Sequence, residues 1–232
     1  MRRNLPWLIG ILLAVAFIAV LPFSVTVVPI AEVEALAAAE EFNAETFVAG
    51  IFDSQVVPTI QEKAVDLASI LNQFSVNEQG IAQKDELVPI AEQNGVITVG
   101  EAHVYMVTGQ GVVTEVGTES RVKTMTVQLD GYDGPIAVKL YTGPRIPSDE
   151  TAVRDAVGFL DFGDFRSQTE YGKVASELNK LIINQVLGGV EVADLVGKTV
   201  SFTGAFGIRT FNLVEINLSQ VTIAPVSLQV VE

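Results

Sequence analysis

The sequence predicts an α+β protein: N-terminal transmembrane and stalk helices precede an OB-like barrel of five antiparallel strands, with helices inserted between strands three and four. Three observations predict this class. A charge-free apolar run lies near the N-terminus, apolar residues at helical spacing follow it, and from residue 96 onward apolar and polar residues alternate as in strands. The order of three strands, a helical interlude and two strands is that of an OB barrel.

The apolar run extends over 22 residues from Trp7 to Val28, and Arg2 and Arg3 precede it. At about 1.5 Å per residue, a helix of this length just exceeds the roughly 30 Å hydrocarbon core of a bilayer. The arginines favour a cytoplasmic N-terminus. We therefore expect residues 1–30 to be a single-pass signal anchor in the cytoplasmic membrane, with the C-terminal domain on the periplasmic side. A cleaved secretory signal is the alternative, with the small residues 35–39 as its cleavage site.

Composition excludes several classes of function. The chain has 28 acidic and 14 basic residues and a net charge of −14, which repels phosphate backbones, so no nucleic-acid partner is expected. It contains no cysteine, which excludes disulfides, thiol catalysis and a cysteine-linked lipid. One histidine without cysteine does not make a zinc site. We expect neither a metal nor another cofactor.

Residues 31–95 are interpreted as a helical stalk with packing helices. Apolar residues recur at a period near 3.6 between Ala44 and Phe74, and Pro58 should interrupt that helix. A shorter helix is expected over 84–93.

Residues 96–232 are expected to form the barrel domain. The longer of its inserted helices would end at two consecutive glycines and would plug one end of the barrel. The expected strands are 104–116, 121–129, 136–141, 198–206 and 213–230, and the expected helices run from Ser148 to about Val157 and from about 167 to 187.

Two groups of polar residues are candidates for a catalytic role. His103 is the only histidine, and no Gly-x-Ser-x-Gly elbow accompanies it, so a structural role is favoured. Asp161, Asp164 and Glu170 could share acid and base work if burial separated their pKa values. Helix capping is the preferred interpretation of these carboxylates, and no catalytic residue is assigned.

Phe206, Arg209 and Phe211 fall in a predicted loop between the last two strands. In OB barrels this loop flanks the ligand face, where aromatic rings and an arginine could stack on a flat or sugar-like ligand. Closure of the barrel rim is the alternative. An open groove beside Arg209 would favour ligand binding, whereas a groove filled by the inserted helices of 148–187 would favour a protein–protein role.

A family resemblance extends from about Phe42 to the end of the chain and is most specific between Gly143 and Asn179. The residues that carry it are Gly143-Pro144, Ile146, Thr151-Ala152, Arg154-Asp155-Ala156, Phe159, Phe162, Asp164-Phe165, Gln168, Glu170-Tyr171, Val174-Ala175 and Leu178-Asn179, with Ser54-Gln55-Val56, Pro58-Thr59 and Lys63-Ala64-Val65-Asp66-Leu67 earlier. This pattern resembles an uncharacterised bacterial family of predicted periplasmic lipoproteins, whose members tend to be encoded beside ribose-type sugar ABC transporters. The resemblance implies an OB-like barrel and an envelope location. The chain departs from the family in lacking the lipid-bearing cysteine.

Five residues of this block are candidate ligand contacts: Arg154, Asp155, Gln168, Tyr171 and Asn179. A structural interpretation stands beside that one. Arg154 can pair with Asp155, and the remaining three can satisfy buried backbone groups where helix meets barrel.

The predicted function is that of a membrane-tethered, extracytoplasmic, non-enzymatic accessory or binding protein that assists a sugar ABC transporter by binding its substrate protein, its permease or the sugar. Two alternatives remain open. One is an envelope hydrolase that uses the carboxylates Asp161, Asp164 or Glu170. The other is a structural scaffold whose stalk, residues 31–74, packs against partner membrane proteins.

Overall fold

The computed structural model describes residues 42–98, 100–117 and 121–231. The predicted anchor 1–30, the first part of the stalk at 31–41 and the cleavage alternative at 35–39 lie outside these residues. Within the described ranges, none of the helices combines the length and the apolar character needed to cross a bilayer. Residues Asn43–Glu232 form one compact unit.

The first helices of this unit are short and well capped. They are α3 (Ala44–Ile51), the π-helical turn η1 (Phe52–Val56), α4 (Val57–Lys63) and α5 (Leu67–Leu71), with the two-residue strand β1 (Val65–Asp66) before α5. The Asn43 side chain accepts a hydrogen bond from the Thr46 amide at 2.9 Å, and the Asp66 side chain accepts one from the Ser69 amide at 2.8 Å. Pro58 lies in the first turn of α4, where a missing N–H costs no helical hydrogen bond. The π-turn η1 interrupts the α-helix, which begins again at Val57, the residue before Pro58, as predicted.

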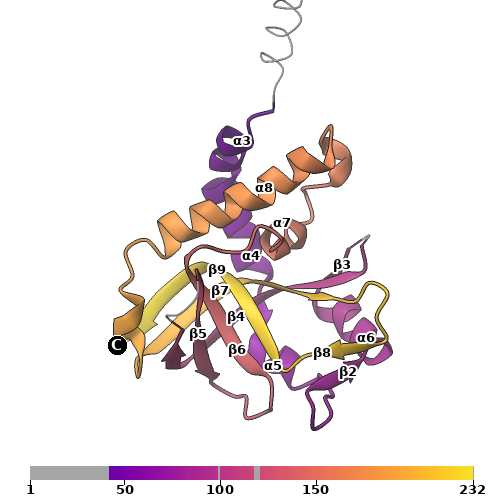
Figure 1. Ribbon diagram of the computed structural model, residues 1–232, viewed down its shortest axis with the longest axis vertical. Coiled ribbons are helices and arrows are strands. Elements are labelled where there is room, and N and C mark those ends of the chain that lie inside the picture. The colour runs from indigo at the N-terminus through magenta and orange to yellow at the C-terminus, as the bar shows by residue number, and fades with distance from the viewer. Residues whose placement is uncertain (1–41, 99, 118–120, 232) are drawn as a thin grey trace, which may run out of the picture. The chain divides into compact units, whose positions relative to one another are not determined.

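Five long strands close the barrel. They are β4 (Ala102–Val116), β5 (Val122–Leu129), β6 (Ala137–Pro144), β7 (Thr199–Arg209) and β9 (Gln220–Val231). They pair in the order β4-β5-β6-β9-β7, and β7 returns to β4 (Figure 1). The pairings are antiparallel except β6 with β9, which is parallel, because the chain crosses the inserted helices and β7 before β9. This is the predicted OB topology.

The last two predicted strands differ from expectation in their limits. β7 continues to Arg209, because its register with β4 extends to the pair Ala102–Arg209. The expected strand 213–230 is divided into β8 (Glu215–Asn217) and β9. β8 leaves the barrel and pairs with β2 (Ile81–Gln83). α6 (Lys84–Asn94) follows β2 and contacts it, and β3 (Val96–Ile97) then pairs with β4.

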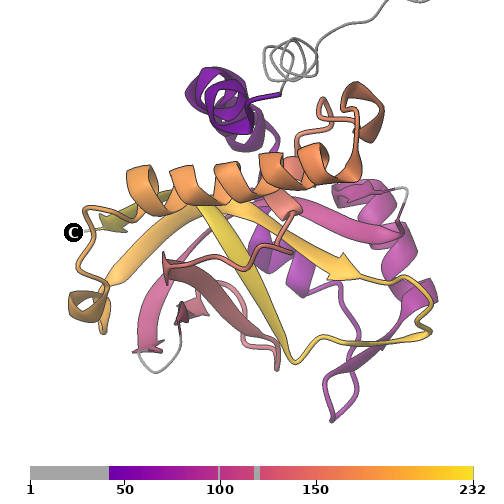
Figure 2. The same cartoon turned by 45° about the horizontal axis from the view of Figure 1, so that its top comes forward.

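The inserted segment contains α7 (Ala152–Ala156), the 3-10 turn η2 (Phe162–Asp164), α8 (Gln168–Leu181), the π-turn η3 (Ile182–Val186) and the 3-10 turn η4 (Val192–Leu195). Ser167 caps α8 by accepting from the Glu170 amide at 3.2 Å. α7 begins after Thr151 and not after Ser148, which was the predicted cap. Figure 2 shows α8 lying across the barrel.

The helix that fills the barrel interior is α5, which was not predicted to do so. Tyr105 and Phe206 stack with ring centres 5.0 Å apart, and Phe74 meets Tyr105 edge-on at 6.0 Å. The same core contains Leu67, Ala68, Ile70 and Leu71 of α5, whereas the buried residues of α8 do not belong to it. The prediction that the longer inserted helix plugs the barrel is therefore wrong. α5 is apolar nearly all round and needs burial on every side, while α8 has a polar face and packs against α3 and α7.

Candidate functional site

Arg154 and Asp155 of α7 are held together with Tyr171 of α8. The Arg154 guanidinium donates from Nε to Asp155 Oδ1 at 2.8 Å and lies 2.7 Å from the same oxygen through Nη2. Its Nη1 donates to the Tyr171 carbonyl at 3.0 Å. The guanidinium carbon also lies 3.6 Å from the centre of the Tyr171 ring. Arg154 is buried, so its positive charge is paired inside the protein.

The rest of this cluster is also hydrogen-bonded. Asp155 accepts from the Thr151 hydroxyl at 2.6 Å and from the Tyr171 hydroxyl at 3.3 Å. The same tyrosine hydroxyl lies 3.2 Å from the Leu160 carbonyl. Burial raises the pKa of Tyr171, an effect that the nearby Arg154 opposes, so the hydroxyl stays a neutral donor. The cluster ties α7 to α8.

Asn179 connects α8 to the segment that follows β6. Its Nδ2 donates to the Glu150 carbonyl at 2.9 Å and to the Pro147 carbonyl at 3.3 Å. The Glu150 carboxylate accepts from the Ala152 amide at 2.9 Å and from the Tyr141 hydroxyl at 3.3 Å. Burial raises the pKa of Glu150. Asn179 therefore satisfies backbone carbonyls where the helix meets the barrel.

The other predicted site residues are scattered. Gln168 is exposed on the first turn of α8. Phe206 is a core residue and lies in β7, not in a loop. Arg209 ends β7, and its Nη2 donates to the Asp149 carbonyl at 2.8 Å and lies 3.1 Å from Asp149 Oδ2. Phe211 follows β7 with 64% of its surface exposed. The eight candidates thus do not form one site.

The three carboxylates considered for hydrolysis have local partners. Asp161 and Asp164 form a capping box around η2, in which the Asp161 amide donates to Asp164 Oδ2 at 3.3 Å. Glu170 accepts from the Arg166 amide at 3.0 Å. Both aspartates are exposed. Their arrangement is that of helix caps.

His103 is buried in β4, and its Nδ1 has no hydrogen-bond partner among the described residues. Burial lowers the pKa of His103, the nearby Lys84 lowers it further, and Glu101 opposes both effects. Lys84 and Glu101 form an ion pair beside it. Over the described ranges, no group of histidine, aspartate and glutamate side chains could hold a metal ion.

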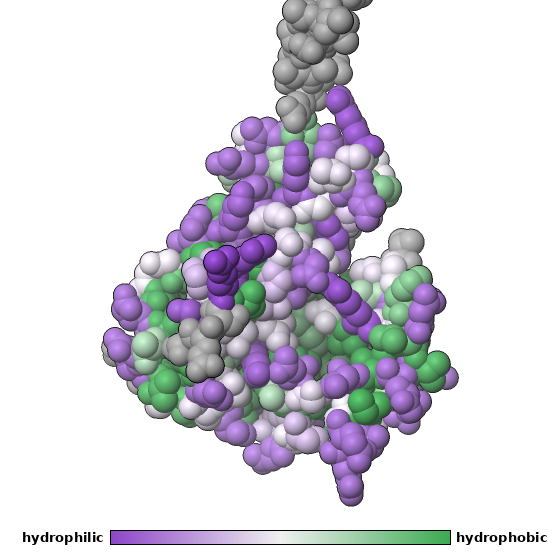
Figure 3. Space-filling model, in the orientation of Figure 1, coloured by the Kyte–Doolittle hydropathy of each residue, from purple (hydrophilic) through white to green (hydrophobic). Residues whose placement is uncertain are grey.

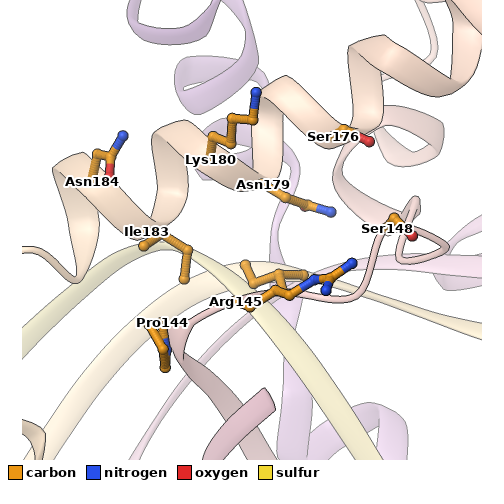
Figure 4. A pocket seen from close by; sticks show the side chains of 9 residues that line it. Pro144, Arg145, Ser148, Ser176, Asn179, Lys180, Ile183 and Asn184 are labelled. Carbon is orange, nitrogen blue, oxygen red and sulfur yellow. The ribbon is translucent and has the colours of Figure 1, made fainter. Parts of the chain in front are cut away.

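A cavity of about 330 Å³ lies between α8 with η3 and the segment that leaves β6 (Figure 4). Its lining residues are Pro144, Arg145, Ile146, Ser148, Ser176, Asn179, Lys180, Ile183 and Asn184. Figure 4 shows Arg145, Asn179 and Ile183 pointing into the space between the helix and the segment. The Lys180 amine points away from that segment and pairs with Glu177 at 2.6 Å. Of these lining residues, only Asn179 is among the site residues predicted from the sequence.

A second cavity, of about 380 Å³, adjoins the first at Pro144 and Ile183. It is lined mostly by apolar side chains, together with Lys123 of β5 and Thr142 of β6. Its full lining is Val116, Lys123, Thr142, Gly143, Pro144, Ile183, Leu187, Gly188, Val190, Glu191, Val192 and Ala193. Arg145 and Lys180 are far apart in the sequence, and the fold brings both residues to the lining of the first cavity.

Fold and site together define an OB-fold protein with helices packed on its barrel and a cleft where helix and barrel meet. The chain belongs to the family described as predicted periplasmic lipoproteins (DUF2291), whose model matches residues 14–229. This family is extracytoplasmic by its description, in agreement with the location expected from the N-terminal sequence. A cysteine that could carry a lipid is absent from this sequence.

One solved structure similar to this chain is an OB-fold protein from Thermotoga maritima. The TM-score is 0.56 with 17% sequence identity, over 83% of this chain and 100% of that one. At this identity the likeness shows the fold alone. A search of curated proteins gave no match.

Proposed function

We propose that this protein is a membrane-tethered, extracytoplasmic accessory protein without enzymatic activity, which assists a sugar ABC transporter by binding one of its protein components. Family membership supports the location. The transporter is suggested by the family resemblance of the 143–179 block.

The observation that carries a protein-binding role is the filled groove beside Arg209. The guanidinium of Arg209 is bonded to Asp149 of the inserted segment, and the Phe206 ring is stacked inside the core. Of the two aromatic rings predicted to contact a flat or sugar-like ligand there, Phe206 is therefore closed to it, and Phe211 is exposed. The paired state of Arg154, Asp155 and Tyr171 supports the same conclusion for the α7–α8 cluster.

The loop between β7 and β8 offers a contact surface for a protein partner. Phe211, Leu213 and Val214 are 64%, 47% and 73% exposed, respectively. Figure 3 shows apolar residues on the side of the molecule where β8 lies in Figure 1. Large side chains grouped in this way on an acidic protein mark an interaction surface.

Crosslinking the full chain in its own membrane, followed by detergent extraction and affinity purification, tests this proposal. Transporter components should be captured by the wild-type protein and lost with the triple variant F211S/L213S/V214S. Val196→Ser is the matched control, because Val196 is 54% exposed but lies outside this loop. Failure to capture any transporter component, or equal capture by the triple variant, would overturn the proposal.

A further inference from the structure

The two cavities adjoin at Pro144 and Ile183, and we call them together the junction groove. It is lined by the residues of both cavities, and Pro144 and Ile183 are shared between them. Each cavity has the size range of a small-molecule site. The first is lined mostly by residues with polar side chains, and the second mostly by apolar residues.

The first part of the groove contains a positive charge that is not paired with any of the described residues. Arg145 is exposed and has no hydrogen-bond or ion-pair partner among the described residues, in contrast to Arg154 and Arg209. In Figure 4 its side chain points into the cavity beside Asn179. A guanidinium binds a carboxylate through two parallel hydrogen bonds, so Arg145 could pair with a ligand carboxylate in this cavity.

The second part of the groove is mostly apolar, with Lys123 and Glu191 also in its lining, and it contains one unsatisfied polar atom. Thr142 is 92% buried, and its hydroxyl has no partner in the part of the chain that the structure describes. An unpaired buried hydroxyl is unfavourable, and a polar ligand atom at this depth would give it a hydrogen-bond partner. Leu187, Val190 and Val192 surround it with apolar surface.

We propose that the junction groove binds an elongated small molecule with a carboxylate at one end, an apolar chain in the middle and a hydroxyl at the other end. The carboxylate pairs with Arg145, the chain crosses Ile183, and the hydroxyl meets Thr142. The chemical class is therefore that of hydroxylated medium-chain carboxylic acids. This site is separate from the β7–β8 loop and does not depend on a transporter partner.

Photo-crosslinking tests the site with the full chain in lipid nanodiscs. The probe is a decanoic acid that carries a diazirine, and labelled residues are mapped by mass spectrometry. We expect labels within 183–193, with 10-hydroxydecanoate competing more strongly than decanoate, and decanol competing poorly because it lacks the anion. Labels spread over the whole surface, or equal competition by decanol, would overturn the proposal.

Three variants sharpen this test. Arg145→Gln should reduce labelling at least tenfold, because it removes the charge-assisted pair, whereas Lys173→Gln, an exposed cation of α8 outside the groove, should leave it unchanged. Thr142→Val should weaken competition by 10-hydroxydecanoate and leave competition by decanoate equal or stronger. Equal labelling of the Arg145 and Lys173 variants contradicts the carboxylate assignment, and unchanged competition in the Thr142 variant contradicts the hydroxyl assignment.

Discussion

Single polar side chains join the helices of this protein to one another and to the barrel. Arg154 reaches from α7 to the Tyr171 carbonyl on α8, and Asn179 reaches from α8 to the Pro147 and Glu150 carbonyls. Because these groups are buried, each would be costly to leave unpaired. Their role is to fix where the inserted segment lies.

Replacing Arg154 by alanine should therefore lower the free energy of unfolding by about 3 kcal/mol, since it breaks a buried ion pair and leaves the Tyr171 carbonyl without its donor. Arg209→Ala is the matched control. Its ion pair with Asp149 is about 70% exposed on both sides and should contribute at most about 1 kcal/mol. Urea unfolding of both variants measures the difference, and equal losses would contradict a structural role for the Arg154 cluster.

His103 makes stability depend on pH in a defined direction. Burial lowers its pKa in the folded state below the ordinary 6.5, so below this pH the unfolded chain binds a proton that the folded chain does not. The contribution of His103 to stability is thus present above pH 6.5 and is lost as the pH falls. Lys84 and Glu101 face it, and burial dominates over both.

We expect the free energy of unfolding to drop between pH 7.5 and pH 5.5, with a smaller drop in His103→Gln. Urea titrations at the two pH values measure both slopes. A variant that keeps the full wild-type slope would show that other groups cause the pH dependence.

The sequence made some of these residue roles predictable and others not. Adjacent opposite charges predicted the Arg154–Asp155 pair, and the resemblance of the 143–179 block singled out Asn179, which lies on the buried side of α8. Phe206 was misplaced because the strand extends beyond its apolar alternation, to Arg209. The importance of Arg145 depends on a cavity between two segments far apart in the sequence, which no local pattern encodes.

Among the elements, strand β4 shows why glycine is required where two strands come close. A Cβ at Gly111 would lie 2.2 Å from the Gln128 carbonyl oxygen and 2.9 Å from the Leu129 Cα. These are backbone atoms of the paired strand β5 and cannot move aside. The β-bulge between Val113 and Glu115 follows within a few residues, at the bend that glycine marked in the sequence.

Gly111→Ala should consequently destabilise the protein by about 3 kcal/mol. Gly172→Ala in α8 is the opposite case, because a Cβ there meets nothing within 4 Å, and it should stabilise by about 0.5–1 kcal/mol. Thermal melts of both variants measure this pair. A Gly111 variant as stable as wild type would show that β4 and β5 separate easily at this point.

Periodicity alone located most elements of the fold. The strands β4 and β5 and the helices α6 and α8 lie where alternation or helical spacing predicted them. The use of α5 as the barrel plug was not predictable from position, because any helix next to a barrel can close it. The composition of each helix decides which one closes the barrel, since α5 is apolar nearly all round and α8 is amphipathic.

In the whole molecule, helices that precede the barrel in the sequence and helices inserted into it both pack against its strands. α5 fills the interior, while α4 and α7 pack on the strands β4 and β7. Helices on both sides of these strands explain why Val104, Tyr105, Met106 and Val107 of β4 are all buried, although alternation would expose every second residue. The result is one compact unit from Asn43 onward.

The proposed function requires this unit to lie outside the cytosol while attached to the membrane. The direct measurement is protease treatment of intact spheroplasts that express the full chain, followed by detection of the 43–232 unit, with a cytosolic protein as the control for lysis. We predict that added protease degrades the unit while the cytosolic control stays intact. A unit that survives in intact spheroplasts and is degraded only after lysis would contradict the extracytoplasmic location and, with it, the proposed function.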